Sequence, residues 1–195
     1  MKKYFIIVIL LFYKVSIAQS TFDYNVQLTP ITIPGLQGLH SYAFAQHNGK
    51  WLIIGGRKDG VHARQPFNAF PNSLNNSNII VIDVATQQFW STSLSTLTTS
   101  LKEQLQATNL NFYQDGDALY IVGGYAFSES LNDHVTFDKL TSIDVPNLID
   151  AVINGTSITS NFKQITNPIF QNTGGQLGKI GNEFYLVGGQ VFTGR

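Results

Sequence analysis

Apolar residues recur along the chain in a pattern that ends three times in a glycine pair. Four apolar residues stand directly before Gly55-Gly56 ("WLII"), Gly123-Gly124 ("LYIV") and Gly188-Gly189 ("FYLV"). A turn dipeptide separates each run from an earlier apolar stretch, and these dipeptides are Asn48-Gly49, Gly116-Asp117 and Gly181-Asn182. Two apolar runs joined by such a turn predict a β-hairpin. The unbroken second run predicts a strand that is buried on both faces.

A second shared pattern follows the first two hairpins. The stretch "NIIVIDVATQQFW" predicts a third strand that ends at Asp83, a turn, and a fourth strand that carries Trp90. Ile-Asp-Val recurs around Asp144, but tryptophan is missing there, and Phe162 after an insertion is the best substitute. The glycine pairs lie 68 and then 65 residues apart, so the sequence predicts a repeated four-stranded unit.

The insertions in these units carry helical patterns. In "TTSLKEQLQATN" we expect Ser100 to be the N-cap and Glu103, three residues later, to complete a capping box. In "DVPNLIDAVING" we expect a helix that starts at Asp144, has Pro146 in its first turn and ends before Gly155. The leucines of both segments are expected to be packing residues.

Together these features resemble the kelch repeat, in which a hydrophobic run leads into Gly-Gly and is followed by an Asp-bearing strand and a tryptophan. The matching residues are Gly55, Gly56, Asp83, Trp90, Gly123, Gly124, Asp144, Gly188 and Gly189. The resemblance implies an all-β fold, an incomplete kelch-type β-propeller of about two and a half four-stranded blades with short helical insertions. The expected blades are residues 39–94, residues 108–166 and an incomplete unit at residues 172–195.

The resemblance also implies roles for the repeat residues. The glycines would let the backbone turn and approach its neighbours closely, and Trp90 would fill the wedge between adjacent blades. The units are longer than the usual kelch repeat of about 50 residues, and the third shows only its first two strands. Since a propeller ring takes about four to eight blades, we expect either a fragment of a longer protein or a ring completed by several copies.

The N-terminus has the layout of a secretory signal peptide. "MKK" is followed by the apolar run "YFIIVILLFY" and by small residues up to Ala18, which predicts a signal peptide at residues 1–18. The alternative, a transmembrane anchor, is disfavoured because the run is too short and Lys14 interrupts its end. Residues 19–38 are expected to form an N-terminal strand or an arm. The mature protein is then secreted or in the cell envelope, in the periplasm or outside the cell, without a stable membrane span.

Charge and cysteine content narrow the possible partners. The chain has 12 basic and 12 acidic residues, and loss of the three lysines before Ala18 leaves nine basic ones, a net charge of −3. No basic stripe remains, so a nucleic-acid partner is not expected. The chain has no cysteine, which excludes disulfides and thiolate metal sites.

The candidate ligand-binding residues lie in the long loops after the first two glycine pairs. They are Arg57, Lys58, Asp59, His62, Arg64 and Tyr125. Arginine together with aromatic residues suits a sugar, a carboxylate or an acidic peptide, so a glycan or protein ligand is possible. The alternative is a surface loop whose polar groups only face solvent.

No catalytic, cofactor or metal motif is present. The four histidines are scattered, and Asp115-Gly-Asp117 occurs where a hairpin turn is required, so we expect no metal site and no cofactor. Two enzyme families share the kelch architecture. Galactose oxidase needs a cysteine that this chain lacks, whereas an N-acetylneuraminate epimerase would need catalytic groups that nothing here identifies.

The sequence therefore predicts a non-catalytic glycan- or protein-binding module at or beyond the cell envelope. The alternatives are a carbohydrate-active enzyme, such as a sugar-acid epimerase, and a purely structural envelope component.

Overall fold

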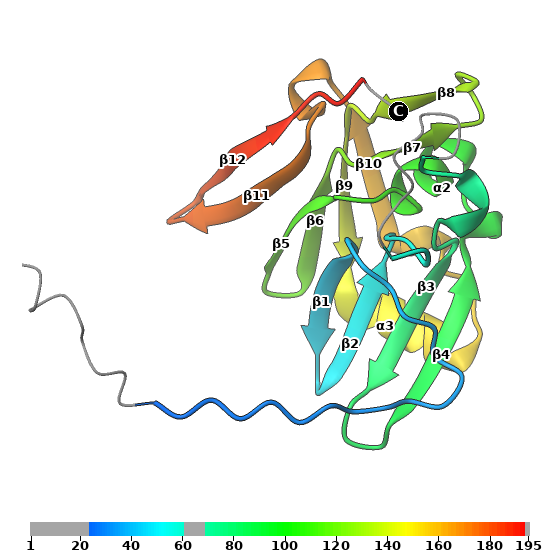
Figure 1. Cartoon of the computed structure of the whole chain (residues 1–195), viewed down its shortest axis with the longest axis vertical. Coiled ribbons are helices and arrows are strands. Elements are labelled where there is room, and N and C mark those ends of the chain that lie inside the picture. The colour runs from blue at the N-terminus through cyan, green and yellow to red at the C-terminus, as the bar shows by residue number, and fades with distance from the viewer. Residues whose placement is uncertain (1–23, 61–68, 194–195) are drawn as a thin grey trace, which may run out of the picture. The chain divides into compact units, whose positions relative to one another are not determined.

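The computed structural model describes residues 24–60 and 69–193 (Figure 1). Contacts between residues separate the chain into two units, residues 1–31 and residues 32–195. Every helix and strand of the described chain belongs to the second unit.

The described N-terminal segment has no regular secondary structure. Residues 24–38, the described part of the segment expected to be a strand or an arm, contain neither helix nor strand. The expected signal peptide, residues 1–18 with cleavage after Ala18, lies outside the described residues. None of the helices in the described chain is long and apolar enough to cross a membrane.

The first sheet (sheet 1) is an antiparallel meander in the order β1-β2-β3-β4. Its strands are β1 (Ala43–His47), β2 (Lys50–Ile54), β3 (Asn78–Asp83) and β4 (Gln88–Ser93). The first predicted hairpin is confirmed by β1 and β2. The third strand ends at Asp83 and the fourth carries Trp90, as predicted. The Asp83 carboxylate accepts the Ala85 and Thr86 N–H groups, which shapes the β3–β4 turn.

The second sheet (sheet 2) repeats this strand order with insertions. It has the order β10-β9-β6-β5 and is antiparallel throughout. Its strands are β5 (Asn111–Asp115), β6 (Ala118–Val122), β9 (Lys139–Asp144) and β10 (Phe162–Thr166). A separate hairpin stands between β6 and β9, formed by β7 (Tyr125–Ser128) and β8 (Asp133–Thr136).

The third unit is a single hairpin of β11 (Thr173–Ile180) and β12 (Glu183–Gln190). It confirms the third predicted hairpin, but β12 is mostly exposed, so the expected burial on both faces is wrong for this strand. The fold is thus all-β in class, with antiparallel sheets, none of which closes on itself.

Two α-helices connect the strands in the described chain, α2 (Thr99–Leu105) and α3 (Val145–Asn154). The prediction for α3 is confirmed, since the Asp144 side chain accepts the Asn147 N–H and Gly155 ends the helix in the left-handed region. The capping box predicted for α2 is wrong. Thr98 is the N-cap, which puts Glu103 deeper in the helix and buries it.

Short 3-10 turns complete the connections. They are η2 (Asn72–Leu74), η3 (Leu94–Thr96), η4 (Thr159–Asn161) and η5 (Pro168–Phe170).

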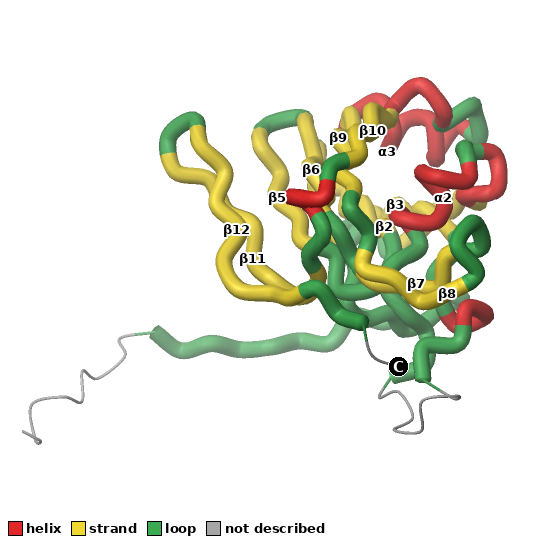
Figure 2. Tube along the Cα trace, turned by 90° about the horizontal axis from the view of Figure 1, so that it is seen from above, coloured by secondary structure: helices red, strands yellow, loops and turns green. Residues whose placement is uncertain are grey.

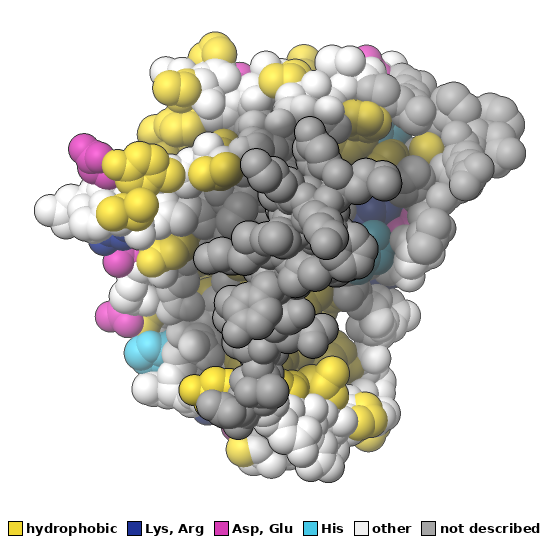
Figure 3. All heavy atoms as spheres, turned by 60° about the vertical axis from the view of Figure 1, so that its left-hand side comes forward, with side chains coloured by type: hydrophobic (Ala, Val, Ile, Leu, Met, Phe, Trp, Pro, Cys, Tyr) yellow, Lys and Arg dark blue, Asp and Glu magenta, His cyan; other side chains and the backbone are white. Residues whose placement is uncertain are grey.

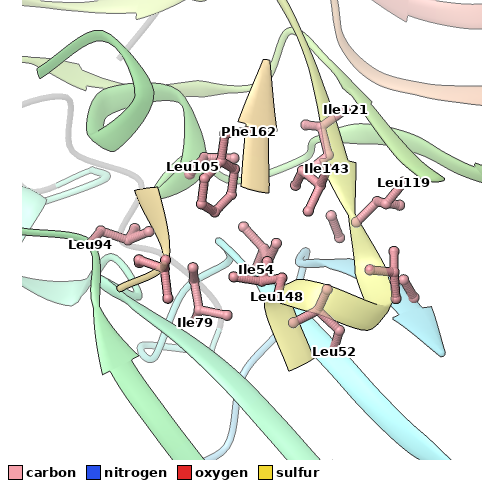
Figure 4. Packing of buried hydrophobic residues seen from close by; sticks show 14 of the residues in the cluster. Leu52, Ile54, Ile79, Leu94, Leu105, Leu119, Ile121, Ile143, Leu148 and Phe162 are labelled. Atoms are coloured by element: carbon pink, nitrogen blue, oxygen red, sulfur yellow. The ribbon is translucent and has the colours of Figure 1, made fainter. Parts of the chain in front are cut away.

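Sheets 1 and 2 share one hydrophobic core. In Figure 4, Leu52, Ile54 and Ile79 of sheet 1 and Leu119, Ile121, Ile143 and Phe162 of sheet 2 converge with Leu148 of α3. Trp90 is partly buried against this core, in keeping with its expected place between neighbouring sheets. Burial of so many aliphatic side chains is the main term that holds the two sheets together.

Phe162 does not occupy the place of Trp90. Phe162 lies opposite Ile143 in sheet 2, whereas Trp90 lies opposite Val81 in sheet 1. Because Ile143 precedes Asp144 as Ile82 precedes Asp83, Phe162 corresponds to Phe89, the partner of Ile82. The position that corresponds to Trp90 is held by Lys163. The expectation that Phe162 takes the place of the tryptophan in the second unit is therefore wrong.

Hydrogen bonds between consecutive units recur at the repeat spacing. The Gly56 N–H donates to the Ala107 carbonyl at 2.8 Å, and the corresponding Gly124 N–H donates to the Asn172 carbonyl at 2.9 Å. Likewise, the Ser41 carbonyl accepts the Asn109 N–H, and the Asn109 carbonyl accepts the Gly174 N–H. The third unit therefore docks on the second as the second docks on the first, and the β11–β12 hairpin lies beside β5 (Figure 2).

Candidate functional site

The glycine pairs hold the following residue at an equivalent place in each unit. The residue directly after the glycine pair is Arg57 in the first unit, Tyr125 in the second and Gln190 in the third. Each forms a β-bridge with a residue at the start of its unit: Arg57 with His40, Tyr125 with Thr108, and Gln190 with Thr173. All glycines of the pairs have positive φ values between 65° and 95°. A Cβ on Gly55 would lie 2.6 Å from the Ala107 carbonyl oxygen, and one on Gly56 would lie 2.5 Å from that of His40. Glycine is thus required both for the turn and for the close approach.

Arg57, the first candidate residue, is buried and its guanidinium is held by protein groups. Only 1% of the residue is exposed. Nε and Nη2 donate to the two carboxylate oxygens of Asp59 at 2.9 and 2.6 Å, and Nη1 donates to Asn75 Oδ1 at 2.7 Å. The guanidinium also lies 5.3 Å from the ring centre of Phe70. Arg57 therefore anchors the loop that contains Asp59, Phe70 and Asn75.

The contact with Arg57 also lowers the pKa of the Asp59 carboxyl. The hydrogen bonds and the positive charge of Arg57 hold the pKa of the Asp59 carboxyl below its ordinary value, although partial burial acts in the opposite direction. His40 Nε2 lies 3.5 Å from Asp59 Oδ1. The carboxylate is thus charged at neutral pH and forms part of a compact polar cluster.

Tyr125 joins this cluster through aromatic contacts. It is 2% exposed, and its ring meets those of Phe70 and Phe192 edge to face, with centroids 5.2 and 4.8 Å apart. His134 lies on the opposite strand of the hairpin, and its ring stacks on that of Tyr125 with the ring centroids 5.9 Å apart. Phe70 therefore bridges Arg57 of the first unit and Tyr125 of the second.

The remaining candidates are placed differently. Lys58 is exposed, and its backbone N–H donates to the Leu74 carbonyl. His62 and Arg64 lie outside the described residues. Of the six candidates, the structure brings Arg57, Asp59 and Tyr125 together.

A cleft suited to a polar ligand lies beside the β7–β8 hairpin, and we call it the hairpin cleft. Its volume is about 560 Å³. It is lined by α2, the hairpin and the ends of β9 and β10, with residues Thr99, Ser100, Glu103, Ser128, Ser130, Leu131, Val135, Thr136, Phe137, Asp138, Lys139, Thr166 and Gln171. Lys139 Nζ donates to Thr166 Oγ1 at 3.2 Å and lies 3.6 Å from Asp138 Oδ1. Hydroxyl groups, two acids and one base thus line a common space.

Glu103 fixes one wall of the hairpin cleft. One carboxylate oxygen accepts the N–H and the hydroxyl of Ser130, both at 2.8 Å, and the other accepts the Ser128 hydroxyl at 3.0 Å. Burial opposes ionisation, but these hydrogen bonds outweigh it and hold the pKa of the Glu103 carboxyl below its ordinary value. The bonds tie the tip of the β7–β8 hairpin to α2.

Gln104 fixes the second wall. It is fully buried, and its amide donates to the carbonyls of Gly123 and Lys139 and accepts the hydroxyl of Thr141 at 2.6 Å. Sequence reasoning missed Glu103 and Gln104 as network residues. The available signal was that Glu103 and Gln104 directly precede the apolar Leu105 in α2. The capping-box interpretation instead assigned Glu103 to the start of the helix.

A second polar cleft, of about 680 Å³, lies at the far end of sheet 2. Its lining includes Ser142 and Lys163, which correspond to Val81 and Trp90 of sheet 1. Ser142 and Lys163 thus line a polar cleft, whereas Val81 and Trp90 at the same positions of sheet 1 pack in the hydrophobic core. Three aspartates also line it, yet the described part of the chain has no group of histidine and carboxylate side chains placed to hold a metal ion.

No family model matches the sequence, and no curated protein matches it significantly. Function is therefore inferred from the geometry of the described residues.

Proposed function

We propose that the protein is an exported kelch-type β-propeller that binds a glycan through the hairpin cleft. Three features support the propeller assignment: the shared strand order of sheets 1 and 2, the glycine pairs, and the hydrogen bonds that recur between consecutive units. A closed ring of this kind contains about four to eight blades, so further blades complete it.

The lining of the hairpin cleft is the observation that carries the proposed ligand class. Six serine and threonine residues line it together with Gln171, Asp138 and Lys139, and Leu131 and Val135 supply apolar surface. A sugar ring presents hydroxyl groups at its edge and C–H groups on its faces, which matches this mixture. The volume of about 560 Å³ is in the range of small-molecule sites.

Binding to immobilised glycans, followed by calorimetry on the best ligand, tests the proposal. Asp138→Ala removes a carboxylate that is partly exposed in the cleft, and Asp150→Ala on the exposed side of α3 is the matched control. We expect the first variant to weaken binding about tenfold or more, because a hydrogen bond to a charged group contributes about 1.5–3 kcal/mol. Equal binding by both variants, or no glycan ligand at all, contradicts the proposal.

The other functions considered give different results in the same experiments. Capture of a protein without any glycan would identify a protein-binding module. Interconversion of sialic acid forms by the purified protein would identify a sugar-acid epimerase. Neither result would support a glycan-binding role.

Export is part of the proposal and has its own test. N-terminal sequencing of the protein recovered from the envelope or the medium of a secreting host is expected to start at Gln19. An intact N-terminus that starts at Met1 would contradict it.

A further inference from the structure

The hairpin cleft lies on the side of sheet 2 that faces sheet 1. Lys139 and Thr166 are directly opposite each other in β9 and β10. Because alternate residues of a strand share a face, Lys139 is on the same face of β9 as Ile143, which packs in the core shared with sheet 1. The residues that line the cleft all lie between Thr99 and Gln171, so the cleft belongs to the first two units and their connections.

Most hydroxyl groups of the hairpin cleft can offer a ligand only lone pairs. Four of the six already donate their hydrogen to a protein acceptor, and these four belong to Ser100, Ser128, Ser130 and Thr136. A serine or threonine hydroxyl has one hydrogen and two lone pairs, so each of these groups can still accept a hydrogen bond but cannot donate another. The cleft therefore favours a ligand that is rich in hydrogen-bond donors.

Asp138 adds a charged acceptor with spare capacity. Its side chain is 39% exposed, and the ammonium group beside it, Lys139 Nζ, lies 3.6 Å from Oδ1, beyond hydrogen-bonding distance. The Glu103 carboxylate, in contrast, already accepts three hydrogen bonds from Ser128 and Ser130. Since a carboxylate has about four acceptor sites, Asp138 is the acid of the cleft that is better able to bind a charged donor.

The charges that line the cleft favour a cation over an anion. Glu103 and Asp138 supply two negative charges, and Lys139 supplies one positive charge. An acidic sugar would have to pair with Lys139, whose Nζ already donates to Thr166 and lies beside Asp138. An ammonium group on a sugar brings three N–H donors and a positive charge, which match the Asp138 carboxylate and the lone pairs of the hydroxyl groups.

We propose that the hairpin cleft selects a glycan with a free amino group, a 2-amino sugar such as glucosamine, and that Asp138 binds its ammonium group. Leu131 and Val135 supply apolar surface for the C–H face of the sugar ring. The inference rests on the proposed glycan-binding function and names the class of sugar. A neutral or acidic glycan as the preferred ligand would leave that function standing and overturn the inference, whereas the absence of any glycan ligand would overturn both.

Calorimetry on the full chain with two trisaccharides of the same linkage tests the selection. One probe is the β-linked trimer of glucosamine, in a buffer acidic enough to keep its amines protonated, and the other is the corresponding trimer of N-acetylglucosamine. We expect the amino trimer to bind about tenfold more tightly, because hydrogen bonds to a charged partner are the stronger ones. Equal affinity for the two trimers, or tighter binding of a galacturonic acid trimer, would overturn the inference.

Nonspecific attraction of a cationic sugar to an acidic surface is the alternative that protein variants separate. Only 12% of the residues are charged, and on the face shown in Figure 3 the acidic side chains lie apart from one another. Asp138→Asn keeps the shape of the side chain and removes its charge, and Asp150→Asn removes an equal charge from the exposed side of α3.

The two variants are compared by the ratio of their affinities for the amino and N-acetyl trimers. We expect Asp138→Asn to lower the preference for the amino trimer about tenfold and Asp150→Asn to preserve it. An equal change of preference in both variants would overturn the inference in favour of nonspecific attraction.

Discussion

Replacing Gly123 with alanine tests whether close contact between units, and not only the turn, requires glycine. Gly123 has a φ of 65°, and a Cβ there would lie far inside van der Waals contact of the Asn172 carbonyl oxygen of the third unit. Gly188, the first glycine of the third pair, has a φ of 73°, but a Cβ there would have no heavy atom within 4 Å. Gly188→Ala therefore shares the conformational cost and lacks the clash.

The magnitudes follow from these two terms. Alanine in the left-handed region costs about 1–2 kcal/mol, and both variants pay this cost. In Gly123→Ala the Asn172 carbonyl must also move away, which breaks its 2.9 Å hydrogen bond from the Gly124 N–H. Leaving buried polar groups unpaired adds about 1–3 kcal/mol. We expect a loss of about 2–5 kcal/mol for Gly123→Ala, a large share of a typical free energy of unfolding of about 5–15 kcal/mol.

Urea denaturation measures the difference directly. The two tryptophans, Trp51 and Trp90, both lie in sheet 1, so their fluorescence is read together with far-UV circular dichroism, which reports on all sheets. If Gly123→Ala does not fold, Gly55→Ala gives a milder version of the same contact, with a Cβ 2.6 Å from the Ala107 carbonyl oxygen. Equal losses for Gly123→Ala and Gly188→Ala, within about 0.5 kcal/mol, would refute the reasoning.

Three further predictions use the same measurement. Arg57→Leu is expected to cost about 3–5 kcal/mol because it leaves the partly buried Asp59 carboxylate without its partner, and a loss no larger than that of the exposed control Lys58→Leu would contradict this. Trp90→Ala is expected to cost about 2–3 kcal/mol, less than a fully buried tryptophan, and an unchanged urea midpoint would show that Trp90 does not pack between the sheets. The pKa values of Asp59 and Glu103 are lowered in the folded protein, so their stabilising contributions are present above their ordinary pKa values of 3.8 and 4.5 and are lost as the pH falls through the lower folded values. The free energy of unfolding should therefore fall with acidification in this range, and a flat profile would contradict the pKa directions.

Much of the fold was predictable because its signals are local. Each hairpin is specified by an apolar run and a turn dipeptide within a dozen residues, and α3 is specified by Asp144 and Gly155 at its two ends. The β7–β8 hairpin was expected to be a loop, because its strands have only four residues each and β8 has a single apolar one, Val135. Its position depends on Glu103, which is distant in sequence.

The candidate site was less predictable for a related reason. Arginine is usually exposed, so a sequence with Arg57 at the start of a polar loop suggests a group that is free to bind a ligand. Its burial depends on Asp59, Asn75 and Phe70 converging on one place, which no local pattern encodes. The same holds for the hairpin cleft, whose lining comes from four separate elements.

The position after each glycine pair shows how the units can share a backbone and differ in function. The backbone turn at the glycine pairs places Arg57 and Tyr125 at equivalent buried positions. Each then contacts a different segment, because Arg57 hydrogen-bonds to Asp59 and Tyr125 stacks on His134. Gln190, the third member, is exposed. Because the backbone contacts between units are made by peptide groups, the side chain at this position is free to vary, and the loop that it anchors can be exchanged without loss of the repeat. Ligand specificity in such a protein is therefore expected to reside in the inserted segments, such as the β7–β8 hairpin, and the glycine pairs to govern stability alone.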